Sequence, residues 1–301
     1  MSLETSSAVL ALPRARGRVA DFVALTKPRI VLMVLVTTLA GFYLASRSTP
    51  QPGMVVRTLV GMALAAGGAL ALNMFMERDL DARMERTRHR PLPDGRLLPG
   101  EALLFGCALT GAGLACLALA VGLACAGVTA ASVAGYLFVY TPLKRHSSLC
   151  SLVGGVPGAL PPVAGWAAAR GTLDVEAWVL FAILFLWQMP HSLAIARLYR
   201  QDYARAGLRL LPVVDPEGRS TDRQILSHSL ALVAVGMLPT LIGLAGPLYF
   251  ATALVLGLGQ LACGVRLALV RTDAGARGVV LASLVYLPVL LAAMTLDKVS
   301  M

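Results

Sequence analysis

The residues best suited to chemistry lie in one short stretch, residues 73–87, which reads Asn-Met-Phe-Met-Glu-Arg-Asp-Leu-Asp-Ala-Arg-Met-Glu-Arg-Thr. A spacing of four residues puts Asn73, Glu77 and Asp81 on one face of a helix. Three oxygen-bearing side chains can converge there on a hard cation, and Mg²⁺ uses one or two protein carboxylates together with substrate phosphate oxygens. We therefore expect these three residues to be catalytic and to bind a Mg²⁺ ion that bridges to a diphosphate.

Basic side chains follow this stretch directly, and a guanidinium group can bind phosphate oxygens bidentately. We predict that Arg86 and Arg90 bind the diphosphate, together with Lys144 and Arg145, which should lie at the same membrane face. The alternative is that these charges only anchor helix ends at the interface. It is less favoured because the preceding polar residues lie within or at the edge of an apolar run, where unpaired polar groups are costly.

A second group of chemical residues is the segment 187–191, Trp-Gln-Met-Pro-His. A proline inside a membrane helix frees a backbone carbonyl and bends the chain, commonly where the helix lines a cavity. Gln188 and His191 should therefore face a cavity. His191 is open to three interpretations: a catalytic proton shuttle, a ligand to an iron-bearing substrate, or a hydrogen-bonded packing residue. We assign four residues to the acceptor side or a second site: Trp187, Gln188, Asp202 and Tyr203.

The elements that must position these residues are membrane helices. Of 301 residues, 57% are hydrophobic and only 14% are charged, so a bilayer must be the main solvent. A span needs about 20 mostly apolar residues, and nine runs have about that length. We expect an all-α polytopic membrane protein with about nine transmembrane helices around a central cavity. The predicted spans are 30–46, 54–76, 102–120, 121–143, 149–169, 176–196, 225–244, 247–268 and 277–296.

The net charge of +10 does not indicate a nucleic-acid partner, because no segment is long enough to form a soluble basic face. With nine spans and the N-terminus inside, 22 of the 26 basic residues fall on the inside. The exceptions are Arg47, Arg57, Arg170 and Lys298. This asymmetry predicts an N-inside, C-outside orientation, in a cell inner (cytoplasmic) membrane, with the site loops on the cytoplasmic side.

We expect an inside N-terminal tail (residues 1–25) and a single transmembrane domain (residues 26–301) with two inside loops, 77–101 and 197–224. These loops carry ten of the sixteen carboxylates. They follow spans two and six, which have the same direction, as expected for two parallel four-helix units about a cavity. A Gly/Pro-rich segment, residues 153–166, predicts either close helix packing through its glycines or a broken helix beside a flat ligand.

At this point the residues resemble a known family. The pattern Asn73-x3-Glu77-x3-Asp81, with the Met-x-Arg-Thr-x2-Arg-Pro-Leu-Pro that follows, resembles the first signature of the protohaem IX farnesyltransferases (haem O synthases), within the UbiA superfamily of intramembrane prenyltransferases. Other superfamily members usually show Asn-Asp-x2-Asp-x3-Asp, so Glu77 is informative. Further matching segments are residues 25–29, 140–145, 157–166 and 187–191.

The resemblance implies transfer of a farnesyl group from farnesyl diphosphate to a vinyl group of haem B, with addition of water, to give haem O. It implies Mg²⁺ as cofactor and suggests the next haem-modifying enzyme as a partner. The chain departs from the family at Ser192, where Phe is usual, at Gln201, where Asp is usual, and at Arg209, where Pro-Met usually precedes Leu-Pro. Gln201 offers no charge, which removes one carboxylate from a second metal position near Asp202.

Two rival functions remain. The first is prenylation of an aromatic quinone precursor, which Glu77 and the 187–191 segment argue against. The second, from another class, is a haem transporter or haem-binding assembly protein. Such a protein would use broken helices and buried polar groups, but it would not need carboxylates paired with an arginine clamp at one membrane face.

Overall fold

The computed structural model describes residues 17–299, which are almost entirely helical. Of the predicted N-terminal tail, residues 1–16, with Arg14 and Arg16, lie outside the described residues. The remainder of the tail forms a short helix, α1 (Arg18–Leu25). Its Asp21 is buried and its carboxylate binds Arg96, 3.0 Å away, so the helix is attached to the loop that follows the second span.

Within residues 17–299, nine helical segments are long and apolar enough to cross a membrane, as predicted. Each contains about 20 residues because that length covers the hydrocarbon thickness. The six unbroken spans are α2 (Pro28–Ala45), α3 (Pro52–Met76), α5 (Pro99–Ala120), α10 (Val175–Leu198), α15 (Pro247–Val270) and α16 (Asp273–Leu296). The three interrupted spans are α6 (Leu123–Ala134) with η1 (Gly135–Tyr140) and α7 (Thr141–Leu143), α8 (Cys150–Ala159) with α9 (Pro161–Arg170), and α13 (Arg219–Gly236) with α14 (Leu238–Leu241).

The predicted division between the third and fourth spans is confirmed, and it lies at Gly122. Its φ of +154° is rarely adopted by residues with a side chain, and it separates α5 from α6. The predicted start of the seventh span at residue 225 is wrong, because α13 begins six residues earlier, at Arg219. The Asp215 carboxylate accepts hydrogen bonds from the backbone N–H and hydroxyl of Thr221, which stabilises a first helical turn too polar to be recognised as membrane helix.

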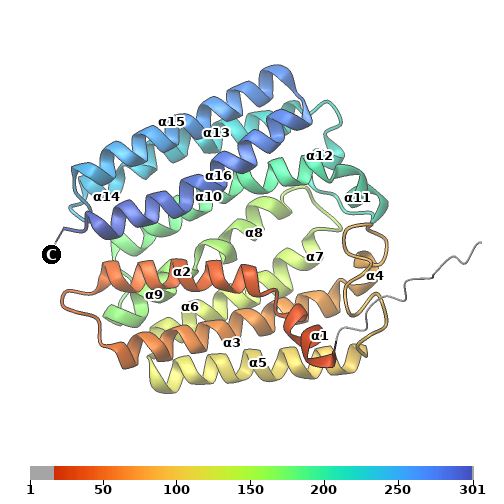
Figure 1. Cartoon of the computed structure of the whole chain (residues 1–301), viewed down its shortest axis with the longest axis horizontal. Coiled ribbons are helices and arrows are strands. Elements are labelled where there is room, and N and C mark those ends of the chain that lie inside the picture. Colours follow the sequence, from red (N-terminus) through yellow and green to blue (C-terminus); the bar gives the residue numbers. More distant parts are fainter. Residues whose placement is uncertain (1–16, 300–301) are drawn as a thin grey trace, which may run out of the picture.

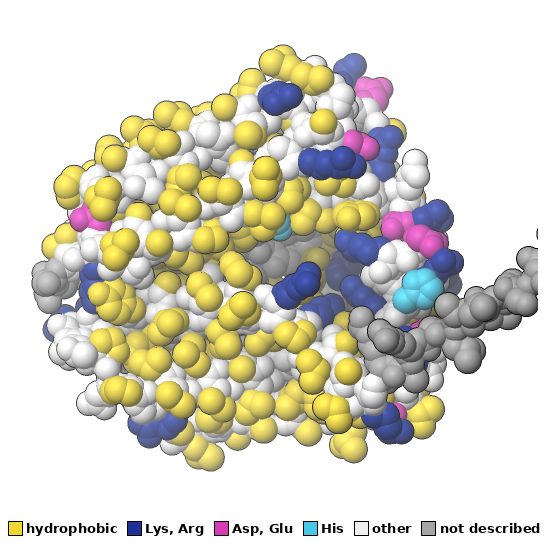
Figure 2. Space-filling view, in the orientation of Figure 1, with side chains coloured by type: hydrophobic (Ala, Val, Ile, Leu, Met, Phe, Trp, Pro, Cys, Tyr) yellow, Lys and Arg dark blue, Asp and Glu magenta, His cyan; other side chains and the backbone are white. Residues whose placement is uncertain are grey.

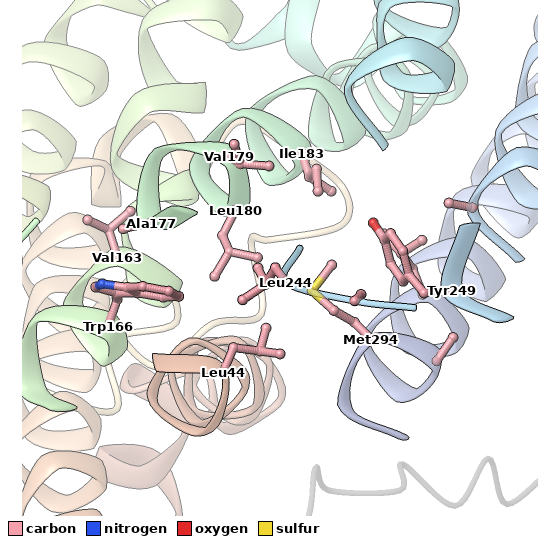
Figure 3. Packing of buried hydrophobic residues seen from close by; sticks show 14 of the residues in the cluster. Leu44, Val163, Trp166, Ala177, Val179, Leu180, Ile183, Leu244, Tyr249 and Met294 are labelled. Carbon is pink, nitrogen blue, oxygen red and sulfur yellow. The ribbon is translucent and has the colours of Figure 1, made fainter. Parts of the chain in front are cut away.

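The helices form two groups (Figure 1). In one group α3 packs along α5 and α2 along α9, while in the other α10, α13, α15 and α16 pack against one another. A buried core joins the groups at the end that carries the C-terminus. Figure 3 shows Trp166 of α9 and Leu44 of α2 beside Leu180 of α10 and Met294 of α16. Large side chains fill the space between the two groups there, whereas a cavity lies between them towards the other end.

The opposite end carries the short charged helices α1, α4 (Arg78–Asp81) and α11 (Arg200–Arg205), together with the apolar turn α12 (Leu211–Val214) (Figure 1). The two loops that were predicted to share a membrane face, 77–101 and 197–224, thus lie at one end of the bundle. Figure 2 shows Lys and Arg side chains gathered there around a hollow, while hydrophobic side chains cover most of the visible surface. The predicted helical membrane fold is confirmed.

Candidate active site

A cavity of about 460 Å³ lies between the two helix groups at this polar end. Helices α3 and α4 form one wall, and η1, α8 and α10 form much of the rest. Figure 2 shows its mouth as a hollow rimmed by basic side chains. Nine of the predicted site residues line it: Asn73, Glu77, Asp81, Arg86, Arg90, Lys144, Gln188, His191 and Tyr203.

Asn73, Glu77 and Asp81 lie along one wall of the cavity, although not on one regular helix. Helix α3 ends at Met76, and Glu77 has φ and ψ angles of −100° and 6°. The Glu77 N–H still donates to the Asn73 carbonyl at 2.9 Å, and the Asp81 N–H to the Glu77 carbonyl at 2.8 Å. The chain therefore bends at Glu77 but keeps the four-residue spacing that directs the three side chains the same way. All three side chains are buried.

Each of the two carboxylates already has a basic partner. Lys144 Nζ donates to Glu77 Oε1 at 2.8 Å, and an Arg90 nitrogen donates to Asp81 Oδ2 at 2.7 Å. The predicted metal ligands and the predicted diphosphate ligands thus contact each other directly. Buried ion pairs of this kind are costly to break unless both partners acquire new ones. A metal diphosphate would supply both, because a metal ion can bind the carboxylates while phosphate oxygens bind the cations.

Lys27 is a further cavity residue that the spacing of the sequence alone did not single out. Its Nζ donates to Asn73 Oδ1 at 3.3 Å, while Asn73 Nδ2 donates to Thr141 Oγ1 at 3.1 Å. Lys27 adopts a left-handed conformation with φ of +48°, which is uncommon for a residue with a side chain and concentrates at functional sites. Burial, with the positive charges of Arg90 and Lys144, lowers the pKa of Lys27 to about 8. The sequence signal that could have identified Lys27 is its position, directly before Pro28 at the start of an apolar span.

Arg86 is held at the cavity mouth by two aromatic rings. Its guanidinium lies 4.6 Å from the centre of the Tyr199 ring and 5.5 Å from that of Tyr203, and it donates to the Tyr203 hydroxyl at 3.0 Å. Cation–π contacts of this kind fix the plane of the guanidinium. The other N–H groups of the Arg86 guanidinium are therefore already oriented and can bind an anion without a further loss of side-chain freedom.

The α10 side of the cavity carries Gln188 and His191. Gln188 Nε2 donates to the Gly155 carbonyl of α8 at 2.7 Å, which joins two cavity walls. His191 Nδ1 lies 2.7 Å from Ser283 Oγ of α16, and the His191 ring stacks on Trp187 with 5.3 Å between centres. Trp187 does not line the cavity itself but lies behind His191.

Two further predicted residues lie away from the cavity lining. Arg145 is exposed, unlike its neighbour Lys144, and Asp202 binds Arg205 in an ion pair on its own helix. The structure therefore does not bring Arg145 to the diphosphate end or Asp202 to the other carboxylates. Sequence spacing could not distinguish Lys144 from Arg145, because adjacent residues point in different directions at a helix end.

The Gly/Pro-rich segment, residues 153–166, contains both a helix break and glycines in close packing. The span breaks at Leu160, between α8 and α9. The glycines also permit close packing, since a Cβ atom on Gly154 would lie 2.4 Å from the Tyr140 ring and one on Gly158 would lie 2.4 Å from Gln188 Oε1. Tyr140 belongs to η1, a π-helical turn, and such turns are frequent at functional sites.

A narrower apolar chamber of about 150 Å³ adjoins the cavity. Ile30, Leu70, Tyr136 and Gly158 line both spaces, so the chamber extends the cavity towards the middle of the bundle. Its own lining is almost entirely apolar and includes Met62 and other small or aliphatic side chains. Charge at one end and hydrocarbon at the other suit a ligand with an anionic head and an apolar tail.

The cavity also fits a magnesium ion that carries substrate oxygens. Among the described residues, no three His, Cys, Asp or Glu side chains converge as a complete protein metal site. Two carboxylates and one amide do share a wall, and Glu77 Oε2 and Asp81 Oδ1 make no hydrogen bond with the described residues. Mg²⁺ usually binds in this way, through one or two carboxylates and the phosphates of its substrate.

Fold and site together define an integral membrane protein with an amphiphilic cavity, charged at one end and apolar beyond it, within a helical bundle. The model of the UbiA prenyltransferase family matches residues 34–292. The chain belongs to this family, as the sequence resemblance predicted, and it is a prenyltransferase.

Two similar proteins within this family have the same name. The protoheme IX farnesyltransferase of Solibacter usitatus (strain Ellin6076) is 48% identical over 290 residues, which cover 92% of this chain and 98% of that protein. The protoheme IX farnesyltransferase of Myxococcus xanthus (strain DK1622) is 42% identical over 284 residues, covering 93% and 95%.

Solved structures share the fold at low sequence identity. A UbiA homologue from Aeropyrum pernix K1 has a TM-score of 0.70 and 19% identity, covering 88% of this chain and 98% of that one. A UbiA homologue from Archaeoglobus fulgidus, bound to GPP and Mg²⁺, has a TM-score of 0.64 and 16% identity, covering 91% and 99%.

Proposed function

We propose that this prenyltransferase moves a farnesyl group from farnesyl diphosphate to a vinyl group of haem B, with addition of water, to give haem O. The names of its relatives support the activity, and the relatives match nearly the whole chain. The observation that carries the site assignment is the continuous cavity, charged at one end and apolar beyond it.

The charged end binds the diphosphate. Four cationic side chains face the cavity against two carboxylates, so the lining carries an excess of two positive charges, which complements an anionic head group. The cations are Lys27, Arg86, Arg90 and Lys144. Asn73, Glu77 and Asp81 hold Mg²⁺, which supplies Lewis-acid stabilisation of the diphosphate when it is bound. The A. fulgidus homologue with GPP and Mg²⁺ supports this cofactor for the family fold.

The chemistry follows from where charge develops. Cleavage of the allylic C–O bond leaves a delocalised farnesyl cation and a diphosphate, and the cationic side chains stabilise the charge that accumulates on the leaving oxygens. The apolar chamber holds the isoprenoid chain and keeps water from the cation until it reacts. The electron-rich vinyl group of haem B attacks the farnesyl cation. Water then captures the resulting cation beside the macrocycle and loses a proton to the released diphosphate, which leaves a hydroxyl.

The acceptor end is formed by α10 and its neighbours. Gln188 and His191 lie on the α10 wall, with Trp187 behind the imidazole, which provides a polar and aromatic surface for a flat macrocycle. No specific observation favours either of the rival functions, which are prenylation of a quinone precursor and haem transport or assembly. The relatives in the comparison are named as haem farnesyltransferases, which favours a haem acceptor over an aromatic quinone precursor and an enzyme over a transporter.

We also infer that the cavity opens on the cytoplasmic side of a cell inner membrane. The charged loops lie together at one end of the bundle, and basic loops remain on the cytoplasmic side of membrane proteins. Transfer of the product to the next haem-modifying enzyme stays a prediction.

Genetic complementation tests the proposal. The gene is expressed in a bacterial host that lacks its own haem farnesylation, and extracted haems are separated by liquid chromatography and identified by mass. We expect haem O with the natural chain and none with Glu77→Gln at equal membrane abundance. A host that accumulates only haem B with the well-expressed natural chain would refute the proposed acceptor.

A further inference from the structure

The contact between His191 and Ser283 determines which imidazole nitrogen faces the cavity. Ser283 is fully buried on α16 and lies outside the cavity lining. Its hydroxyl donates to the Val280 carbonyl at 2.6 Å, and the same oxygen lies 2.7 Å from His191 Nδ1. A serine hydroxyl has one proton, and that proton is already donated. With that proton on the Val280 carbonyl, Ser283 Oγ accepts from His191, and we assign the hydrogen to Nδ1 on this pattern of contacts.

A neutral imidazole protonated on Nδ1 has its lone pair on Nε2. Among the described residues, Nε2 has no hydrogen-bond partner, and it lies on the edge of the ring opposite to Ser283. Because Ser283 lies behind the cavity wall while His191 forms part of that wall, the free lone pair belongs to the cavity side.

The ring cannot easily turn to exchange the two nitrogens. Trp187 stacks on the imidazole with only 15° between the planes, and its indole Nε1 donates to the Ser283 carbonyl at 2.8 Å. One residue of α16 thus fixes both the orientation of His191 and the aromatic ring that covers one of its faces. This arrangement resembles that of metal-binding histidines, which donate their second ring N–H to a neighbouring group and thereby have a fixed tautomer and a more basic ligand nitrogen.

We propose that His191 Nε2 is an axial ligand to the iron of the haem substrate and that Ser283 is the positioning residue that prepares it. This inference rests on the proposed acceptor, because only an iron porphyrin offers an open axial position to a neutral imidazole. Iron ligation orients the macrocycle, so that a vinyl group on its edge points towards the diphosphate end of the same cavity.

The test compares two porphyrins that differ only in iron. Detergent-solubilised full-length protein is titrated with haem B and with metal-free protoporphyrin IX, and binding is followed by the Soret absorbance. We expect His191→Ala to lose the spectrum of histidine-ligated iron and to bind haem B at least 10-fold more weakly, with unchanged affinity for protoporphyrin IX. We expect Ser283→Ala to bind haem B about 10-fold more weakly, the lower end of what a lost partner of a metal ligand costs.

Controls separate ligation from folding. Ser229→Ala removes another fully buried serine hydroxyl, one without a hydrogen-bond partner, and should leave haem affinity unchanged. Ser283→Thr retains the hydroxyl and should keep most of the natural affinity. Added imidazole should restore the iron-ligand spectrum of His191→Ala.

The outcomes distinguish this inference from the function on which it rests. If the natural chain farnesylates haem B while His191→Ala retains both its haem spectrum and its affinity, the ligation proposal is wrong and the proposed function stands. Equal weakening for haem B and protoporphyrin IX would also overturn it, because the residue would then act only through packing. A natural chain that neither binds nor modifies haem B would refute the proposed function itself.

Discussion

At the scale of single residues, the site is organised by exchange of ionic partners. Glu77 and Asp81 bind Lys144 and Arg90 in ion pairs, and the same four groups are proposed to bind the metal diphosphate. Such pairing neutralises buried charge before the substrate arrives. It also means that removing one partner leaves the other unpaired, so variants that keep shape are more informative than truncations.

Glu77→Gln and Asp81→Asn should each lose most of the activity, about 100-fold or more, while the protein remains folded in the membrane. Each change keeps the shape of the side chain and deletes the charge that binds Mg²⁺. Glu85→Gln and Asp79→Asn are matched controls, because these carboxylates are exposed in the same loop. Turnover is measured against Mg²⁺ concentration, and near-natural rates at limiting Mg²⁺ would show that the two carboxylates do not bind the metal.

Arg86→Lys should raise the KM for farnesyl diphosphate by about 10-fold, since a charged hydrogen bond contributes about 1.5–3 kcal/mol. A lysine keeps the charge but loses the planar fork that Tyr199 and Tyr203 hold in place. Arg88→Lys, in the same loop but outside the cavity lining, serves as the control. An unchanged dependence of rate on farnesyl diphosphate concentration would make Arg86 an interfacial anchor.

At the scale of elements, the apolar chamber decides which isoprenoid chain fits. It lies between α3, α6 and the α8–α9 break, and its small residues leave the space that a tail needs. Ala66→Leu narrows the chamber, so we expect the rate with farnesyl diphosphate to fall at least 10-fold relative to the rate with geranyl diphosphate. Ala131→Leu adds the same atoms to an exposed position on α6 and should change neither rate. An unchanged ratio in Ala66→Leu would place the isoprenoid tail elsewhere.

The elements also show what the sequence could predict. Hydropathy located the nine spans found among residues 17–299, because a run of about 20 apolar residues has few alternatives. It missed the polar start of α13, where hydrogen bonds from Thr221 to the Asp215 carboxylate, rather than hydrophobicity, stabilise the first turn. Spacing found Asn73, Glu77 and Asp81, because four-residue spacing survives the bend at Glu77.

Residues whose position depends on tertiary contacts were harder to predict. Lys27 reaches Asn73 through a left-handed turn, and Ser283 reaches His191 from a helix 92 residues away. Neither contact has a signature in local spacing. Asp202 was placed near the site by its neighbours in sequence, but an ion pair to Arg205 is what the structure gives it.

At the scale of the whole molecule, the two ends of the helical bundle differ in how the two helix groups meet. The large apolar core around Trp166 fills the end near the C-terminus, whereas the charged loops surround the open cavity (Figures 1 and 3). Substrates therefore enter from the side of the charged loops or from the bilayer, and the orientation of the chain decides which compartment supplies them.

Cysteine labelling in intact spheroplasts tests this orientation. Glu217→Cys, in an exposed part of the charged loops, should resist a membrane-impermeant maleimide, while Ser48→Cys at the opposite end should react. The unmodified chain corrects for its own five cysteines. Labelling of Glu217→Cys without labelling of Ser48→Cys would reverse the proposed orientation.

The central claim, that one cavity joins a metal diphosphate to a haem acceptor, is tested most directly by product analysis in a defined membrane. Purified protein in liposomes is incubated with farnesyl diphosphate and an equal mixture of haem B and an aromatic quinone precursor, with Mg²⁺ or with excess chelator. The account predicts haem O as the dominant product with Mg²⁺, identified by mass, and none with chelator. A prenylated aromatic product with haem B unchanged, or haem O formed at an equal rate with chelator, would contradict it.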